Sequence, residues 1–545
     1  MERMAIMKKT VSVLLFLMCT VVLINAAFAA SDGLQGNGLA TTESGICRDV
    51  AELARKYDAA KKLPESVVFE GKSCSRNEVA QCFLALMEKV LEKCKKEGPE
   101  SIPREDLERI AAVHEALQGE LAKYEGYLVR REEIQQVLAA PETPPFMLKM
   151  GINGFLRGEG VQNYRLPDFS VTSGHGEGRF LYRVKPYAYW HPTDYIDIHL
   201  EGQGYGFSGG SQYYGKYSLY QGFVEAKLPE KSLLALKVGR QEFNYGSTFI
   251  LGPNSFYDGL AFDAVRLRLQ PLNQLSIDLL GGLYASPFAT GLGGNLTGGY
   301  ATYTFSEGNA VDAYALRDTG SVLHHHGEHL DIWGIRTTAK LGPLSLEFEP
   351  VYESGKIFDG SAGNHSISAY GGHLDLAAGG ELGGFNNKVV VGYALGSGDR
   401  NSSGGIPSGK EFRNPDNDTT LVGDMSVITD LSGITVNGRH ASGLHIFTLG
   451  WGIDISKELN FTATGHYFLA NSVENGFSRG IGLETDFALT YTVNDDVSLI
   501  FAYDRFFTGG FFKDSNGGGS PGDIQYGYVM LQFNLAKAWP RPKKG

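Results

Sequence analysis

The sequence predicts a mainly β fold, in which a large antiparallel β-barrel of about 16–18 strands follows a small α-helical region. The chain of 545 residues contains 71 glycines, 27 tyrosines and 31 phenylalanines, but only 20% of its residues are charged. This composition is typical of many strands joined by glycine-containing turns. Beyond about residue 146 apolar and polar side chains alternate, which indicates strands with one apolar and one polar face. The alternation continues for roughly four hundred residues, more than one β-sandwich needs.

Composition and charge argue against other classes of protein. The apolar content of 42% excludes a disordered chain. The mean hydropathy is −0.16, and a single stretch at the extreme N-terminus is apolar enough to cross a bilayer as a helix, which excludes a helical membrane bundle. The net charge of −12 argues against a nucleic-acid partner, because such a partner requires a basic face.

The first residues, 1–30, are typical of a secretory signal peptide. Lys8 and Lys9 precede an apolar run that begins at Val11, and Ala27-Phe28-Ala29 supplies a small-residue cleavage pattern. A retained membrane anchor is the alternative. Export would place the remaining cysteines in an oxidising compartment.

The mature chain divides into three segments. Residues 31–102 form a small helical, cysteine-containing domain, 103–145 form a long helix with a proline-rich linker, and 146–545 form the barrel. The boundary is placed at Pro141, Pro144 and Pro145, because proline ends a helix and extends the residue before it.

Four cysteines fall in the first mature segment: Cys47, Cys74, Cys82 and Cys94. They permit three sets of disulfide pairs, and the sequence does not choose among them. A metal site is the alternative, but Cys-x-x-Cys spacing, which zinc sites usually show, is absent from the sequence. Disulfides that stabilise a small domain are therefore the favoured interpretation.

A heptad-like seam follows Pro103, with spacings of three and four residues. Its members are Leu107, Ile110, His114, Leu117, Leu121, Tyr124 and Leu128. The seam fits a coiled coil that forms oligomers through residues 103–138, and it fits packing within the chain equally well.

The N-terminal region resembles a degenerate S-layer homology domain. The resemblance rests on Asp49-Val50-Ala51-Glu52-Leu53, Val68-Phe69-Glu70-Gly71 and Ser75-Arg76-Asn77-Glu78-Val79-Ala80. It implies a periplasmic location and contact with peptidoglycan or another cell-wall polymer.

The alternating region favours a transmembrane barrel over a soluble sandwich. In a membrane barrel the apolar face meets lipid and the polar face lines the lumen. Export, the length of the region and aromatic clusters at Tyr187–Trp190 and Arg505–Phe507 favour this arrangement. The last strand is expected to close at Phe533, followed by a short basic extension. A barrel of this size leaves an aqueous lumen, and the expected location is the outer membrane of a Gram-negative bacterium.

The barrel region resembles the alginate-export family of outer-membrane barrels. The central matches are Gly239-Arg240-Gln241-Glu242-Phe243-Asn244-Tyr245-Gly246, Leu251-Gly252-Pro253 and Phe262-Asp263-Ala264-Val265-Arg266-Leu267. Further matches are Gly396–Arg400, Phe412–Pro415, Gly482–Asp486 and Phe506–Gly510. The resemblance implies an 18-stranded barrel whose charged, constricted lumen passes an anionic polysaccharide outward.

Charged residues on the polar faces are the candidate lining of the solute path. The basic members are Arg183, Lys185, Arg266, Arg268 and Arg336, together with Arg240 from the family motif. The acidic members are Glu201, Glu347, Glu349, Glu484 and Asp486. Arginine suits carboxylate ligands because its planar fork is permanently charged. The alternative is that these ions pair with one another and hold the barrel in shape.

The sequence therefore predicts a passive, charge-guided channel of the alginate-export type. The alternatives are a general or anion-selective diffusion porin tethered to the cell wall, and a structural envelope tether. We expect outer-membrane lipid and either anionic polysaccharide or small anions as partners. The segment His324–His329 is more typical of a solvated loop than of a metal site. We expect no cofactor and no enzymatic activity, because the His-Glu-x-x-His motif is absent from the sequence and the glycine-rich stretch Gly517–Gly519 is typical of a loop.

Overall fold

The computed structural model describes most of residues 50–121 and 146–540. Within these ranges it leaves out 51, 58, 60–75, 98–101, 103, 166–169, 194, 210–211, 229–232, 254–257, 286–293, 321–327, 360–362, 401–408 and 426. The predicted signal peptide and two of the cysteines, Cys47 and Cys74, lie outside the described residues. The chain divides into two compact units, residues 1–145 and 146–545.

The described helices of the first unit are α4 (Arg76–Glu97), α5 (Arg104–Ala116) and α6 (Gln118–Leu121). One buried cluster joins Phe83 and Val90 of α4 to Ile110 and Leu121 of α5 and α6. The described part of the predicted seam therefore packs inside its own unit, whereas Tyr124 and Leu128 lie outside the described residues. The expected single long helix is interrupted after Ala116, where Leu117 adopts a turn two residues before Gly119, a poor helix former.

Helix α4 limits the disulfide pairing. Cys82 and Cys94 both lie in this helix, and Cys82 is buried. A helix rises about 1.5 Å per residue, so these two cysteines are roughly 18 Å apart and cannot be bridged to each other. Two of the three possible sets of pairs remain, and both involve Cys47 and Cys74.

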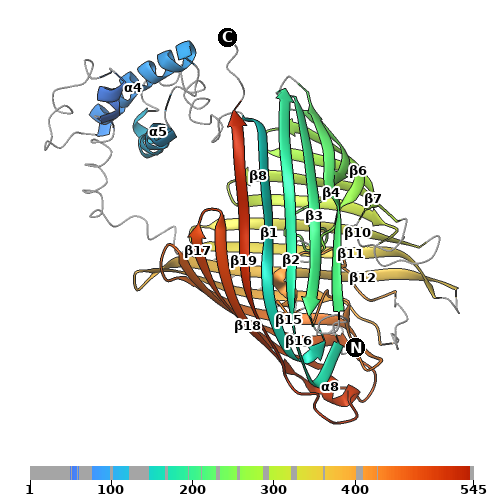
Figure 1. The fold of residues 1–545 in the computed structure, drawn as a ribbon. Coiled ribbons are helices and arrows are strands. Elements are labelled where there is room, and N and C mark those ends of the chain that lie inside the picture. Colours follow the sequence, from blue (N-terminus) through green and yellow to red (C-terminus); the bar gives the residue numbers. More distant parts are fainter. Residues whose placement is uncertain are drawn as a thin grey trace. The chain divides into compact units, whose positions relative to one another are not determined.

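The described residues of the second unit form one antiparallel sheet of nineteen strands (Figure 1). These are β1 (Phe146–Arg165), β2 (Ser170–Thr193), β3 (Ile196–Gly209), β4 (Gln212–Lys227), β5 (Leu234–Gln241), β6 (Phe262–Leu272), β7 (Leu275–Tyr284), β8 (Asn295–Ser306), β9 (Asn309–Asp318), β10 (His329–Leu341), β11 (Leu344–Asp359), β12 (Gly363–Leu382), β13 (Phe385–Gly396), β14 (Gly433–Val436), β15 (Arg439–Asp454), β16 (Leu459–Ser472), β17 (Gly480–Asn494), β18 (Val497–Thr508) and β19 (Ile524–Pro540). A six-residue helix, α8 (Gly510–Ser515), joins β18 to β19.

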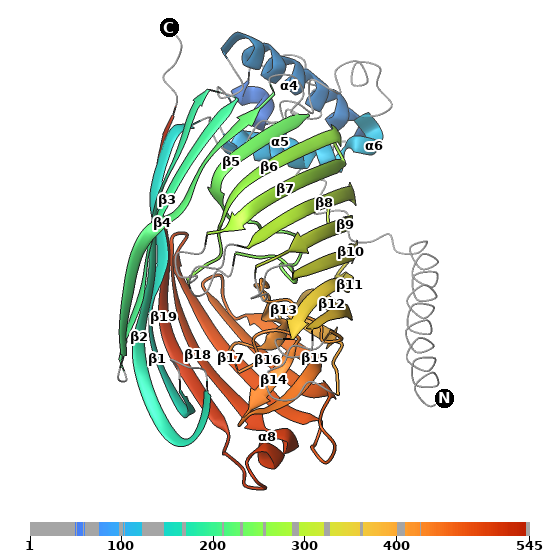
Figure 2. The ribbon, with the colours of Figure 1, turned by 90° about the vertical axis from the view of Figure 1, so that its right-hand side faces the viewer.

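The sheet closes on itself, because β1 pairs with both β2 and β19 (Figures 1 and 2). Strand β13 pairs directly with β15, whereas β14 is a short hairpin partner of β15. The wall therefore contains eighteen strands, and the prediction of an antiparallel barrel is confirmed at the upper limit of the expected count.

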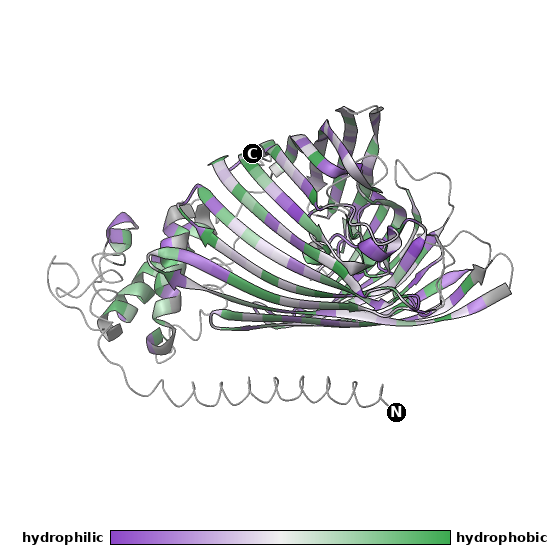
Figure 3. Cartoon of the chain, turned by 90° about the horizontal axis from the view of Figure 1, so that it is seen from below, coloured by the Kyte–Doolittle hydropathy of each residue, from purple (hydrophilic) through white to green (hydrophobic). Residues whose placement is uncertain are grey.

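Side chains alternate between the outside and the inside of the barrel, as the sequence predicts. Figure 3 shows this as apolar and polar bands along the strands. Phe180, Leu200 and Val265 are exposed, whereas Arg183 and Lys185 are buried on the inner face. Exposed aromatic side chains lie close to strand ends: Trp190, Tyr303, Trp451 and Trp539 near one rim, and Tyr217, Tyr370 and Phe507 near the other.

The predicted end of the last strand is wrong. Strand β19 continues past Phe533 to Pro540, and Trp539 pairs with Leu148 of β1. The reason is that β1 begins at Phe146 and offers hydrogen-bonding partners along the whole extension. The supposed extension is therefore part of the wall.

Connections between the strands alternate between two rims. We call the rim with Phe146 and Pro540 the terminal rim, and the opposite one the loop rim. Turns at the terminal rim are short, as at Gly383 and Gly384 between β12 and β13. Two long connections start at the loop rim: residues 242–261, here called the first inserted loop, and 397–432, the second inserted loop.

Candidate functional site

The two inserted loops fold into the barrel and narrow its lumen. Phe249 of the first loop and Phe412 of the second belong to the same buried cluster as the inward side chains Leu280 and Ile332. The charged side chains that line the lumen offer little apolar surface on which a loop could pack. The two loops stay inside because their own apolar side chains bury one another. In the sequence, parts of these loops are recognisable only as matches to a family motif. Their position inside the lumen is visible only in the structure.

The inserted loops hold each other by backbone and side-chain contacts. The N–H of Asp418 donates to the Thr248 carbonyl at 3.0 Å, and the N–H of Gly252 donates to the Asp416 carbonyl at 2.8 Å. The buried Asn414 amide donates to the Phe249 carbonyl at 3.1 Å and accepts from the Leu431 N–H at 3.0 Å. Asn414 therefore joins the first loop to the far end of the second.

Both loops are also bound to the strands. In the first loop, Glu242 pairs with Lys185 at 3.5 Å and the Ser247 hydroxyl donates to Glu349 at 2.7 Å. In the second loop, the Arg413 N–H donates to the buried Glu353 at 3.1 Å. These contacts fix the constriction against opposite parts of the wall.

The strands β2 to β7 form a basic wall, which contains four of the predicted basic lining residues and the predicted acidic residue Glu201. Lys185 pairs with Glu201 at 2.8 Å, with side-chain exposures of 8% and 7%. Arg183 is buried nearby on the same face of β2, with its guanidinium 5.7 Å from the Phe155 ring. The structure places Arg183 and Lys185 among the buried side chains, whereas Arg266 and Arg268 are partly exposed.

Three cations of the basic wall share two carboxylates. Lys237 and Arg266 approach Glu225 at 3.4 and 3.5 Å, and Arg268 binds Asp278 with two contacts of 2.7 and 2.8 Å. This group carries one more positive than negative charge. Arg268 keeps 40% of its side chain exposed, so part of that charge is accessible from the lumen.

Sequence reasoning missed a further ionic group between β1 and β2. Arg157 contacts Glu159 at 2.9 Å, Arg179 also pairs with Glu159, and the Tyr526 hydroxyl donates to the same carboxylate at 2.6 Å. The Arg157 guanidinium stacks on Tyr528 at 3.5 Å. The alternation of Arg157 and Glu159 in the sequence could have revealed this group.

Arg240 does not line the lumen, so that prediction is wrong. It lies on the same face of β5 as the exposed Leu236 and Val238, whereas its neighbour Gln241 is buried. Its guanidinium forms two contacts of 2.8 and 2.9 Å with Asp263, which shares the outward face of β6 with Val265. The alternation of inward and outward positions continues through Arg240 and places it outside.

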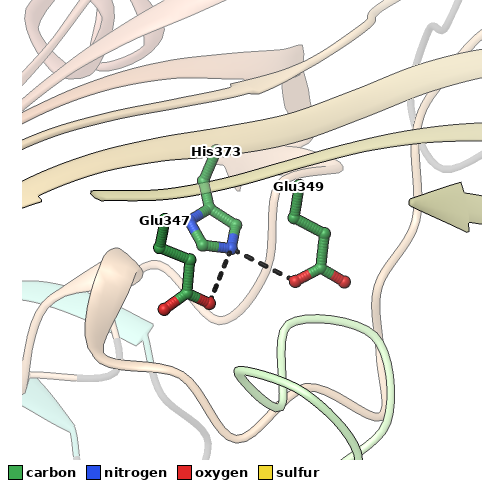
Figure 4. A group of neighbouring side chains, drawn as sticks. All are labelled: Glu347, Glu349 and His373. Atoms are coloured by element: carbon green, nitrogen blue, oxygen red, sulfur yellow. Dashed lines mark hydrogen bonds and ion pairs between the residues drawn. The ribbon is translucent and has the colours of Figure 1, made fainter. Parts of the chain in front are cut away.

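Arg336 reaches the lumen as predicted, where it binds Glu347 at 2.7 Å and Asp312 at 2.9 Å. Glu347, Glu349 and His373 bring their ligand atoms within 4.8 Å of one another (Figure 4). However, Glu349 already accepts from Ser247 and from the Tyr314 hydroxyl, the latter at 2.7 Å, and Arg336 supplies a permanent cation. The geometry fits an ion-paired anchor for the first loop better than a metal site.

An acidic wall lies on β17 and β18. Glu484 and Asp486 face inward as predicted, and Glu484 is fully buried. The Glu484 Oε1 atom accepts from the N–H groups of Asp424 and Met425 at 2.8 and 2.9 Å, so it anchors the second loop. A cavity of about 770 Å³ separates this wall from β10–β13, with Asp375 and Lys388 on its far side.

Residues 324–326 of the histidine segment lie outside the described residues, and His329 lies 3.8 Å from Asp331. In the part of the chain that the structure describes, no helix has both the length and the apolar character required to cross a membrane.

These observations define a closed β-barrel with an apolar outside and a charged, constricted lumen. Its fold is similar to Pseudomonas aeruginosa OccK11 (OpdR), with a TM-score of 0.48, 12% identity and coverage of 72% of this chain and 98% of the other. It is also similar to P. aeruginosa OpdK with vanillate, with a TM-score of 0.47, 13% identity and coverage of 72% of this chain and 100% of the other. A third similar fold is Acinetobacter baumannii OccAB1, with a TM-score of 0.47, 12% identity and coverage of 71% of this chain and 96% of the other. Likenesses this weak assign neither a family nor a substrate to the chain.

No protein-family model and no curated protein matches the sequence. Neither the alginate-export resemblance nor the S-layer resemblance is therefore supported.

Proposed function

We propose that the barrel is an outer-membrane channel that lets small charged solutes diffuse through a narrow, mainly anion-preferring path. The observation that carries this proposal is the inverted polarity of the barrel, with exposed apolar side chains outside and buried ions inside. A soluble barrel would instead bury its apolar face, whereas lipid makes the observed arrangement stable.

The constriction favours small solutes over a polymer. The two inserted loops fill the middle of the lumen with packed aromatic side chains, including Phe249 and Phe412, whose ring centres are 6.0 Å apart. Passage of an anion requires several weak positive sites along a wet path. Lys237, Arg266 and Arg268 provide one such site, because together they exceed their two carboxylate partners in charge.

Single-channel recording of the full-length protein in planar bilayers tests the proposal. We expect steady current in KCl, a reversal potential on the side of anion preference in a salt gradient, and little effect of added polyuronate. A barely conducting barrel that micromolar polyuronate blocks would instead support polysaccharide export. The absence of any current would contradict a channel and favour an envelope tether. The binding of residues 31–140 to cell-wall polymer stays a prediction, and the current recordings do not test it.

A further inference from the structure

Four carboxylates meet where the second inserted loop touches the acidic wall. Glu484 and Asp486 come from β17, Asp504 from β18 and Asp424 from the loop. Asp486 and Asp504 are directly opposite each other in the register of the two strands. Like charges in such a pair repel and destabilise the sheet.

The carboxylates are linked into one group through the loop. The Asp424 N–H donates to Glu484 at 2.8 Å, and the Tyr528 hydroxyl donates to the Asp424 carboxylate at 3.1 Å. Gly423 has a φ of +85°, and a Cβ there would lie 2.4 Å from Glu484 Oε1. Only glycine permits so close an approach, so the loop is built to touch this wall.

The carboxylates are not satisfied by the protein. Asp504 is 1% exposed, and within the described residues the Phe487 backbone is the one hydrogen-bond donor close to its carboxylate, which lies outside good hydrogen-bond geometry. Glu484 Oε2 and Asp486 Oδ1 likewise have no N–H or O–H donor in good geometry among the described residues, and the two carboxyl groups lie within hydrogen-bonding reach of each other. Buried polar groups without partners are rare because each costs free energy, so such a group indicates a missing ligand.

Nearby cations are too few to neutralise this group. His466 Nε2 lies 3.6 Å from Asp486, and the guanidinium of Arg157 attracts the Asp504 carboxylate electrostatically at longer range. Arg157 is already paired with Glu159 at 2.9 Å. The group therefore keeps excess negative charge unless a further cation or protons neutralise it.

The donor set consists of oxygens alone, which suits Mg²⁺ or Ca²⁺ better than a transition metal. Among the described residues, only the Glu347, Glu349 and His373 group brings three ligand atoms within 4.8 Å, so the four carboxylates are more widely spaced. That spacing favours an ion that keeps part of its water shell, as Mg²⁺ does. Asp424, Asp486 and Asp504 line the 770 Å³ cavity, through which such an ion could reach them.

We propose that Asp424, Asp486 and Asp504 hold a hydrated divalent cation of the Mg²⁺ type between the second inserted loop and the acidic wall. The ion neutralises the facing carboxylates and fastens the loop. The site is independent of the transported solute, so its failure would leave the channel proposal intact.

Isothermal titration of the full-length protein, purified in detergent and stripped with EDTA, tests the site with MgCl₂ and then CaCl₂. We expect saturable binding by the wild type, and affinity weakened about 10- to 100-fold in Asp504→Asn and Asp486→Asn. Asp495→Asn is the matched control, because it removes an exposed carboxylate from the turn of the same hairpin. Absence of saturable binding by the wild type, or equal binding by Asp504→Asn, would overturn the proposal.

Thermal unfolding gives a second readout if one variant fails to fold. EDTA should lower the melting temperature of the wild type, and MgCl₂ should restore it. The melting temperature of Asp504→Asn should respond less to Mg²⁺ than that of the wild type, since the variant lacks one of the carboxylates whose repulsion the ion relieves. A wild-type melting temperature that is indifferent to both additions would mean that protons, not a metal, neutralise the carboxylates. Current measured in KCl with EDTA tests the channel separately.

Discussion

The basic wall and the acidic wall both place ionised groups in the lumen, but they balance charge differently. On the basic wall the inward carboxylates lie against cations, as Glu201 lies against Lys185 and Asp278 lies against Arg268. On the acidic wall Asp486 faces Asp504, and no salt bridge joins Asp504 to a cation among the described residues. The comparison teaches that the carboxylates of the first wall are neutralised by cations of the protein, whereas those of the second wall require neutralisation from solution.

The largest expected effect comes from making the basic wall resemble the acidic one. Lys185→Ala leaves Glu201 and Glu242 without their shared cation in a buried setting. Breaking a buried ion pair in this way costs about 3–5 kcal/mol. We expect a clear fall in the melting temperature, measured by circular dichroism in detergent.

Lys457→Ala is the control for this change, because Lys457 is exposed in the turn between β15 and β16. It should melt like the wild type. Equal melting of Lys185→Ala and Lys457→Ala would show that the basic wall does not depend on its ion pairs.

A smaller effect is expected at the contact that keeps the second loop docked between the two walls. Asn414→Ala removes both the donor to Phe249 and the acceptor for Leu431, and each unsatisfied buried group costs about 1–3 kcal/mol. We expect a larger and noisier single-channel current, because the constriction loosens. The exposed Asn386→Ala should conduct like the wild type, and an unchanged, quiet current in Asn414→Ala would argue against a loop-formed constriction.

The smallest effect concerns Asp416 of the second loop, which lies outside the strands. Burial, with a contribution from the nearby Asp318 carboxylate, raises the pKa of Asp416 to about 7, although the Tyr284 hydroxyl donates to it. Because the folded-state pKa lies above the ordinary aspartate value of 3.8, the protonated form is favoured in the folded protein. Loop docking should therefore weaken as the pH rises from about 4 to 7 and then level off.

Melting temperatures measured across this pH range check the Asp416 prediction. Asp416→Asn should flatten the profile, since its amide does not ionise. A profile that the substitution leaves unchanged would assign the pH dependence to other groups.

The strand pattern alone predicted much of the barrel and part of its lining. Alternation placed Arg183 and Arg266 on the inner face, because period two is a local property of a strand. Arg240 was assigned through a motif rather than through alternation, which puts it outside with Val238. The contact of Thr248 with Asp418 joins residues 170 positions apart, and no local pattern encodes it. The facing of Asp486 and Asp504 depends on strand register, which the sequence did not specify.

The most direct test of the account compares two arginines that the sequence treated alike. Reversal potentials in a KCl gradient would be measured for the wild type, Arg268→Gln and Arg240→Gln. Arg268 is exposed to the lumen and Arg240 is paired with Asp263 on the outer face. The account predicts reduced anion preference in Arg268→Gln alone, with Arg240→Gln like the wild type. An equal shift in both variants, or none in Arg268→Gln, would contradict a charge-guided path along the basic wall.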